Sequence, residues 1–155
     1  MVMGRRQRRG FSLVELSITL LIIGVLALMA TPFTIAWAHM SDVQRAKGQL
    51  VQAHGLAKAA ALRNRPVLPA GEVVALIRVD PATQKLALIG CSDASTCAEE
   101  LWAATLPRGV SLNFVNTADA KAVELDNTGK LMGDANNWIG YQISKGEQVE
   151  DGLLY

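Results

Sequence analysis

The sequence has 155 residues, 50% of them hydrophobic and 19% charged, which suits one globular domain with an appendage and leaves little room for a second domain. Fifteen Lys and Arg residues stand against fourteen Asp and Glu residues, so the overall charge gives no argument for nucleic-acid binding. The first ten residues hold four of the basic residues, Arg5, Arg6, Arg8 and Arg9. Removing them would leave a formal charge of −3.

A long apolar run follows this basic segment. No Asp, Glu, Lys or Arg occurs from Leu16 to Ala38. Roughly 20 apolar residues in a helix cross a bilayer core, whereas a soluble helix normally shows a polar stripe. We therefore predict a membrane-spanning helix. The arginines before it predict a cytoplasmic N-terminus, with everything after Ala38 across the membrane.

The small residue that could mark a cleavage site lies before the apolar run. A conventional secretory signal is cut after its apolar segment, but here Gly10 directly precedes Phe11-Ser12-Leu13-Val14-Glu15. This segment resembles the prepilin processing motif of type IV pilins and type II secretion pseudopilins. The resemblance implies cleavage between Gly10 and Phe11 by a membrane-embedded prepilin peptidase, followed by N-methylation of Phe11.

Glu15 and Pro32 are the unusual residues of the apolar helix. A carboxylate in a membrane helix costs about 2 to 3 kcal/mol on insertion scales and is usually functional or paired. One interpretation of Glu15 is a tolerated charge near the head groups. The family resemblance implies instead that it pairs with the methylated amine of Phe11 in a neighbouring subunit. Pro32 removes a backbone donor and predicts a kink.

Beyond the membrane-spanning run the pattern becomes amphipathic. Apolar residues recur at spacings of three and four, which predicts one buried helix face: Val43, Ala46, Leu50, Ala53, Ala57 and Ala60. The opposite face is predicted to carry Asp42, Arg45, Gln49, Gln52 and Lys58. The helix should run from Phe11 to Arg63 or Asn64, because Arg65-Pro66 disfavours its continuation.

The rest of the chain has the pattern of β-strands. We predict strands at 73–79, 85–91, 109–115, 122–126, 138–143 and 148–155, the first two forming a hairpin. The expected fold is α+β: a long N-terminal helix, transmembrane and then amphipathic, packed on a small antiparallel β-sheet domain. The predicted parts are a leader at 1–10, the transmembrane half at 11–38, the amphipathic half at 39–64 and the β-rich domain at 65–155.

Cys91 and Cys97 are the only cysteines, and they bracket Ser92–Thr96. A domain outside the cytoplasm favours their pairing. Zinc would need two more ligands, and a redox role would favour the tighter Cys-x-x-Cys spacing. We expect a structural disulfide, no metal and no cofactor. No nucleophile elbow, phosphate-binding loop or catalytic triad order appears, so we do not expect an enzyme.

The subclass rests on further resemblance. The segments 57–67, 106–110 and 125–129, with Trp102, resemble the FimT/GspH group of minor pilins and pseudopilins. The implied role is a low-abundance subunit at or near the tip of a type IV pilus or a type II secretion pseudopilus. A cysteine pair in the middle of the domain, not near the C-terminus as in many major pilins, argues against a major pilin.

The resemblance also implies partners and a location. The partners would be other pilin or pseudopilin subunits, the prepilin peptidase and an inner-membrane assembly platform. The chain would cross the bacterial inner membrane once, with its C-terminal domain in the periplasm, before entering the filament. The alternative function is a DNA-uptake minor pilin. We do not expect nucleic-acid binding, because the segment 146–155 is acidic and phosphate contact needs clustered Lys or Arg.

Overall fold

A computed structural model describes residues 11–63, 68–69, 71–93, 96–133 and 138–155. The chain divides into two compact units, Met1–Trp37 and Ala38–Tyr155, and each is described by itself. The described elements are one α-helix, α1 (Leu13–Arg63), which runs through both units, and the strands β1 (Val73–Asp80), β2 (Lys85–Asp93), β3 (Thr96–Thr105), β4 (Ser111–Val115), β5 (Ala122–Asp126), β6 (Leu131–Met132), β7 (Ile139–Lys145) and β8 (Gln148–Leu154).

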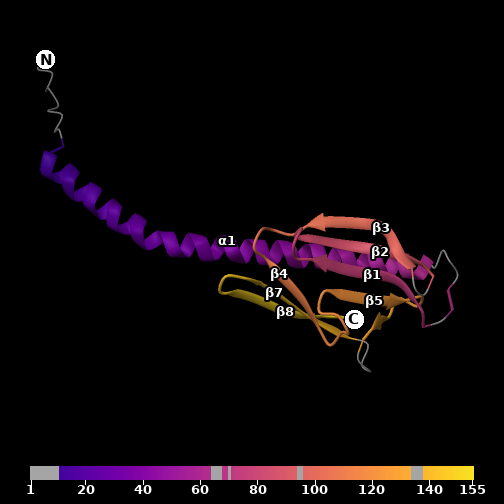
Figure 1. The fold of residues 1–155 in the computed structure, drawn as a ribbon. Helices are drawn as coiled ribbons and strands as arrows, with labels where there is room; N and C mark the ends of the chain where they lie inside the picture. Colours follow the sequence, from indigo (N-terminus) through magenta and orange to yellow (C-terminus); the bar gives the residue numbers. More distant parts are fainter. Residues whose placement is uncertain (1–10, 64–67, 70, 94–95, 134–137) are drawn as a thin grey trace, which may run out of the picture. The chain divides into compact units, whose positions relative to one another are not determined.

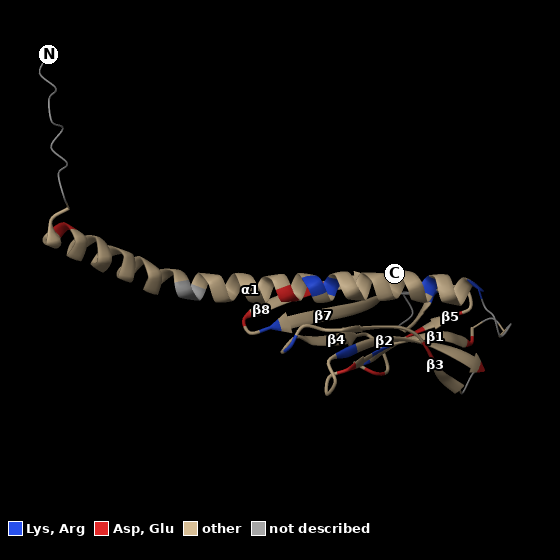
Figure 2. Ribbon diagram, turned by 90° about the horizontal axis from the view of Figure 1, so that it is seen from above, with Lys and Arg blue, Asp and Glu red and all other residues tan. Residues whose placement is uncertain are grey.

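The strands of the second unit form two antiparallel sheets (Figure 1). One sheet has five strands in the order β3-β2-β1-β5-β6, and the other has three in the order β4-β7-β8. The second half of α1 lies along one side of both sheets (Figures 1 and 2). The predicted α+β fold, a long helix packed on antiparallel strands, is therefore confirmed, with two sheets in the domain.

Small side chains bring α1 close to the sheets. The buried face of the helix consists mainly of alanine, and each of these residues is 2% exposed or less: Val43, Ala46, Leu50, Ala53, Ala57 and Ala61. They share one hydrophobic cluster with residues of both sheets, among them Ile77 and Leu125 of the larger sheet and Ile143 of the smaller. Because alanine adds only a methyl group, the helix backbone can approach the strands closely.

The helix prediction was wrong in detail at two points. The helix begins at Leu13, not Phe11, whereas its end at Arg63 agrees with the prediction. Its last core residue is Ala61, whereas Ala60 is only half-buried. A step of four residues after Ala57 replaces the predicted step of three, because a helix of 3.6 residues per turn keeps one face only if both steps occur.

The residues of the predicted polar face are not all exposed. Arg45 and Gln52 are exposed as expected. Asp42, Gln49 and Lys58 are half-buried, and two of them bond to the sheets. Polar side chains that flank the apolar stripe can extend to partners on the packed strands and become partly buried. A prediction that divides the helix into one buried and one exposed face does not include such positions.

Two strands, β3 and β6, were not predicted. The β3 sequence, Thr-Cys-Ala-Glu-Glu-Leu-Trp-Ala-Ala-Thr, lacks the alternation of a half-buried strand and is rich in residues that favour helix. Pairing with β2 along its length imposes the extended conformation. β6 has two residues and is too short to leave a pattern.

One short segment joins the two sheets through its carbonyl groups. The backbone N–H of Phe114, in β4, donates to the carbonyl of Ala120 at 2.8 Å. The N–H of Val79, in β1, donates to the carbonyl of Lys121 at 2.8 Å. Consecutive peptide groups thus bond one strand from each sheet, and the two sheets are connected by hydrogen bonds as well as by the shared core.

Gly152 of β8 lies under the ring of Tyr141, which faces it across the β7–β8 pair. A Cβ at residue 152 would overlap the ring atoms of Tyr141, a residue that is only 6% exposed. Gly140 of β7 has more space. A Cβ at residue 140 would lie 3.4 Å from the Cβ of Val115, at the edge of ordinary contact.

We therefore expect Gly152→Ala to lower the free energy of unfolding by about 1 to 3 kcal/mol, since the buried ring must shift. Gly140→Ala is the matched control, with an expected change below about 1 kcal/mol. Denaturant unfolding of the full chain in detergent micelles, followed by tryptophan fluorescence, measures both. Equal losses for the two variants would contradict the interpretation of Gly152.

Candidate functional site

The start of α1 carries the residues of the predicted processing site. Gly10 lies outside the described residues. Phe11 precedes the helix and is 81% exposed. The N–H of Leu16 donates to the carbonyl of Ser12 at 3.1 Å, which makes Ser12 the residue that caps the first turn. The structure thus places Phe11 just outside a helix that begins two residues later.

Glu15 lies in this first turn and is exposed. Among the residues that the structure describes, it has no ion-pair partner. Ser12 and Glu15 have the spacing of a capping box, and a negative charge is favourable near the positive end of a helix. Glu15 can therefore serve its own helix as well as a partner outside the chain.

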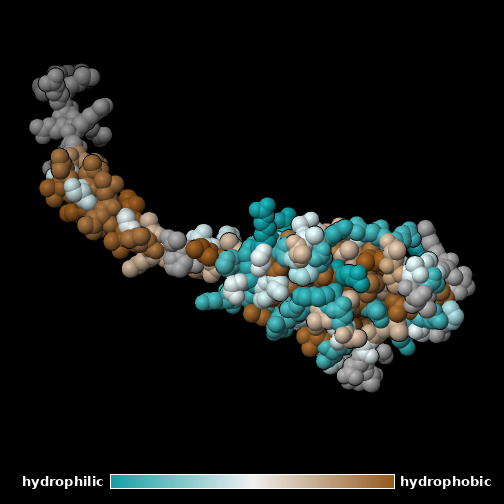
Figure 3. Space-filling view, in the orientation of Figure 1, coloured by the Kyte–Doolittle hydropathy of each residue, from teal (hydrophilic) through white to brown (hydrophobic). Residues whose placement is uncertain are grey.

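The first unit presents an apolar surface on all sides of α1. From Leu16 to Ser41 the sequence has no charged residue, and Figure 2 shows no charge on the described part of this stretch. Its large apolar side chains are exposed (Figure 3), for example Leu21 at 68% and Met29 at 71%. α1 is long and apolar enough to cross a membrane. Such a surface is stable in lipid but not in water.

Hydroxyl groups in this apolar stretch bond back to the helix. Ser17 Oγ donates to the carbonyl of Leu13 at 2.8 Å, and Thr19 Oγ1 donates to the carbonyl of Leu16 at 2.8 Å. Thr34 Oγ1 donates to the carbonyl of Ala30 at 3.1 Å. These polar atoms are satisfied without water, as a lipid environment requires. α1 is helical through Pro32, and the kink at this position stays a prediction.

In the second unit, two ion pairs fix the three-stranded sheet to α1. Lys145 Nζ lies 2.5 Å from Asp42 Oδ2, and Lys47 Nζ lies 2.5 Å from Glu150 Oε1. The hydrogen bond from Lys47 to Glu150 raises the pKa of Lys47, and electrostatic interaction with Tyr141 and Glu150 adds to this. Exposed and partly exposed ion pairs of this kind add little to stability, because water screens the charges.

The turn between β7 and β8 also contacts the helix. Gly146 has φ +58°, and a Cβ at this position would lie 2.8 Å from Nδ1 of His39. A side chain would be disfavoured twice here, by the backbone conformation and by the contact with His39. The hairpin therefore contacts α1 at two residues. It forms an ion pair with Asp42, and the backbone of Gly146 lies next to His39.

Cys91 and Cys97 form a disulfide between β2 and β3. The two residues are direct partners in the strand register, and their Cα atoms are 3.9 Å apart. The disulfide fixes the end of the β2–β3 pair, where the register shifts on both sides of it. This location fits a structural role.

We expect Cys91→Ala/Cys97→Ala to lower the free energy of unfolding by about 2 kcal/mol, because a six-residue separation closes a small loop in the unfolded chain. Thermal unfolding with and without dithiothreitol measures the effect. Reduction should destabilise the natural chain and leave the double variant unchanged. A double variant as stable as the oxidised natural chain would contradict a stabilising role.

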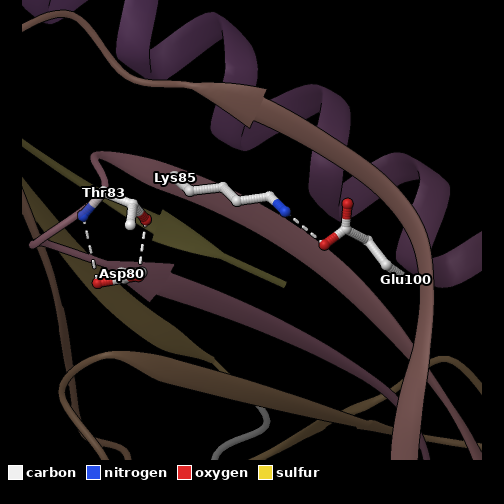
Figure 4. Close-up of polar contacts among 4 residues, drawn as sticks. All are labelled: Asp80, Thr83, Lys85 and Glu100. Carbon is white, nitrogen blue, oxygen red and sulfur yellow. Dashed lines mark hydrogen bonds and ion pairs between the residues drawn. The ribbon is translucent and has the colours of Figure 1, made fainter.

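Two aspartates that could suggest an ion site hold turns. Asp80 accepts bonds from the hydroxyl and N–H of Thr83 and from the N–H of Ala82, and these lower its pKa, the Thr83 hydroxyl contributing most (Figure 4). Burial would raise the pKa of Asp126, but bonds from the hydroxyl and N–H of Thr128 and the N–H of Lys130 outweigh it and lower the pKa. In the described ranges no three His, Cys, Asp or Glu residues form a group able to hold a metal ion.

One comparison with known proteins agrees with the motif at the start of α1. Residues 5–31 match the family model of the prokaryotic N-terminal methylation motif. No curated protein matches the sequence. Among solved structures, the chain is similar to the minor pseudopilin EpsH from the Type 2 Secretion System of Vibrio cholerae, with 15% identity and a TM-score of 0.42. That match covers 73% of this chain and 96% of the other.

The matched motif and the long helix are continuous in this chain. A methylation motif leads into an exposed, membrane-length helix, and that helix continues onto antiparallel sheets. Over residues 5–31 the chain is thus similar to proteins that carry the prokaryotic N-terminal methylation motif.

Proposed function

We propose that this chain is a minor pilin or pseudopilin subunit that assembles at or near the tip of a type IV pilus or a type II secretion pseudopilus. The observation that carries the proposal is the match of residues 5–31 to the methylation motif, at the start of a helix with an apolar surface on all sides. Cleavage between Gly10 and Phe11 would free the amine of Phe11 for methylation. The exposed position of Phe11 before the helix supports its access to an enzyme.

The location follows from the same helix. The basic segment before α1 supports a cytoplasmic N-terminus, so the second unit would lie in the periplasm. The four proposed parts are the leader at 1–10, the transmembrane half at 11–38, the amphipathic half at 39–64 and the periplasmic domain at 65–155. An inner-membrane assembly platform would then move the subunit from the bilayer into the filament.

Glu15 would guide this step. In lipid, an unpaired carboxylate is costly, and the methylated amine of a neighbouring Phe11 is a cation that would relieve this cost. The pair would form only when two subunits stand in register. The exposure of Glu15 and its lack of an ion-pair partner among the described residues support this role.

The minor subclass rests on the residues that resemble the FimT/GspH group and on the disulfide between β2 and β3 in the middle of the domain. The acidic character of β8 supports a structural subunit over a DNA-uptake pilin. Its Glu150 is held by Lys47, and Asp151 is exposed beside it. A strand with this charge repels phosphate.

The processing step gives a direct test. Mass spectrometry of the protein isolated from membranes of the source organism should find methylated Phe11 at the N-terminus. Gly10→Leu should leave the leader uncleaved, because the bulky side chain replaces the small residue at the cut. A mature chain that begins after Ala38 would contradict the proposal.

Substitutions of Glu15 test the pairing. We expect Glu15→Gln and Glu15→Leu both to reduce incorporation into sheared filaments at least tenfold, since both remove the charge. Immunoblots of filament and membrane fractions measure incorporation. Glu15→Asp, which keeps the charge, is the matched control and should retain more incorporation than either.

Glutamine is the informative variant, because it retains the side-chain hydrogen-bonding capacity of a capping box. If Glu15 serves only its own helix, Glu15→Gln should incorporate normally and Glu15→Leu should not. That pattern, or normal incorporation of all variants, would refute the pairing with Phe11.

A further inference from the structure

A groove of about 380 Å³ lies in the second unit, and its lining includes none of the residues discussed above for assembly. One wall is the outer side of α1, where Leu56, Ala60 and Arg63 follow one another along the helix. The other wall is the β2–β3 edge of the five-stranded sheet, including Leu101 and Trp102. The groove therefore runs between the end of the helix and an edge strand.

The strand register places Leu101 at this groove. Leu88 pairs with Trp102 and Gly90 pairs with Glu99, and paired residues lie on the same face of a sheet. Between these pairs the register shifts, so Leu101 is an extra residue of β3. Its side chain lies over Gly90, where a Cβ would be only 3.2 Å from Leu101 Cδ1.

The groove exposes apolar surface. Leu101 is 44% exposed and Leu56 is 39% exposed, and Trp102 is only partly buried against the core. The small residues Ala60 of α1 and Gly90 of β2 also line the groove. Large apolar side chains around a hollow are typical of sites where a partner inserts an anchor residue.

Two opposite charges border the groove. Glu99 lies on the β3 side and Arg63 on the α1 side, and within the described ranges neither forms an ion pair. The next residue of β3 behaves differently, since Glu100 points to the other face of the sheet and pairs with Lys85 at 2.6 Å (Figure 4). The charges at the groove are therefore available to a partner.

The edge of β3 is poorly suited to the addition of another strand. The register shift at Leu101 and the adjacent carboxylates of Glu99 and Glu100 are features that discourage edge-to-edge pairing. The shape and charges of the groove therefore favour binding of a partner through its side chains.

We propose that this groove binds a segment of another protein that inserts one large apolar side chain, such as Leu, Met or Phe, between Leu56 and Trp102. A Lys or Arg beside this anchor would face Glu99, and an Asp or Glu on its other side would face Arg63. The charge pattern sets the direction in which the segment lies. The inference does not depend on the cleavage at Gly10 or on the pairing of Glu15.

Photo-crosslinking of the full chain in cells of the source organism tests the proposal. The probe p-benzoyl-phenylalanine replaces Leu56 at the rim of the groove or, as a matched control, exposed Gln52 about one turn earlier on α1. Mass spectrometry identifies the linked peptide. We expect the probe at Leu56 to capture one discrete segment at least tenfold more than the probe at Gln52. That segment should contain a large apolar residue next to Lys or Arg.

Charge reversal separates recognition from unspecific contact. With the probe at Leu56, Glu99→Lys should reduce the crosslink at least tenfold, and Glu124→Lys, an exposed reversal on β5, should not. In the Glu99→Lys variant, changing the partner's basic residue to Glu should restore the crosslink from the probe at residue 56. Thermal unfolding of the purified variants should be unchanged, which shows that the loss is not a loss of fold.

Four outcomes would overturn the proposal. Two concern the capture: the probes at Leu56 and Gln52 capture equally, or the linked segment lacks the apolar and basic residues. The other two are equal effects of the two charge reversals and capture of α1 from a second copy of this chain. Processing at Phe11 is measured on the same samples, so failure of the groove is distinguished from failure of the proposed function.

Discussion

The contact between the alanine-rich face of α1 and the two sheets is the interaction on which the second unit depends. Ala46, Ala53, Ala57 and Ala61 are fully buried, so the helix backbone itself forms part of the core. Larger residues would hold the helix further from the strands and open the shared cluster. The close contact also explains how a modest domain can be attached to so long a helix, because the helix supplies one layer of its core.

The same helix is built for two environments. Up to Trp37 its apolar side chains face outward on every side, and its hydroxyls bond to its own carbonyls. From Val43 onward a narrow buried stripe is flanked by polar residues such as Asp42 and Lys47 that reach the sheets. No break in the helix separates the two patterns. Only the side-chain composition changes along the helix, from residues suited to lipid to residues suited to packing on the sheets.

Much of this organisation is readable from the sequence, because it depends on local composition. The apolar run, the helix end at Arg63 and the strand β5 at Ala122–Asp126 follow from patterns of neighbouring residues. The disulfide between Cys91 and Cys97 was expected from their number and the predicted compartment. Glu15 in the first turn follows from the motif. Each of these inferences needs no knowledge of distant contacts.

The features that could not be predicted depend on pairing between distant segments. Alternation and propensity argue against a strand in β3, and only its partner β2 makes it one. The groove needs both the register shift at Leu101 and the missing side chain of Gly90, and neither has a signature in the chain. The connection between the two sheets likewise depends on distant contacts, because the carbonyls of Ala120 and Lys121 accept bonds from β4 and β1.

The two ion pairs between α1 and the smaller sheet have a consequence for how the protein acquires its structure. Asp42 and Lys145 are 103 residues apart in the chain, as are Lys47 and Glu150. The strand β8 is the last element, and Leu154 near its end belongs to the same core as Val43. Contacts between residues so far apart slow folding, because the long intervening loop must close first. The domain therefore cannot complete its core until nearly the whole chain has been synthesised, and until then the alanine face of the helix stays uncovered.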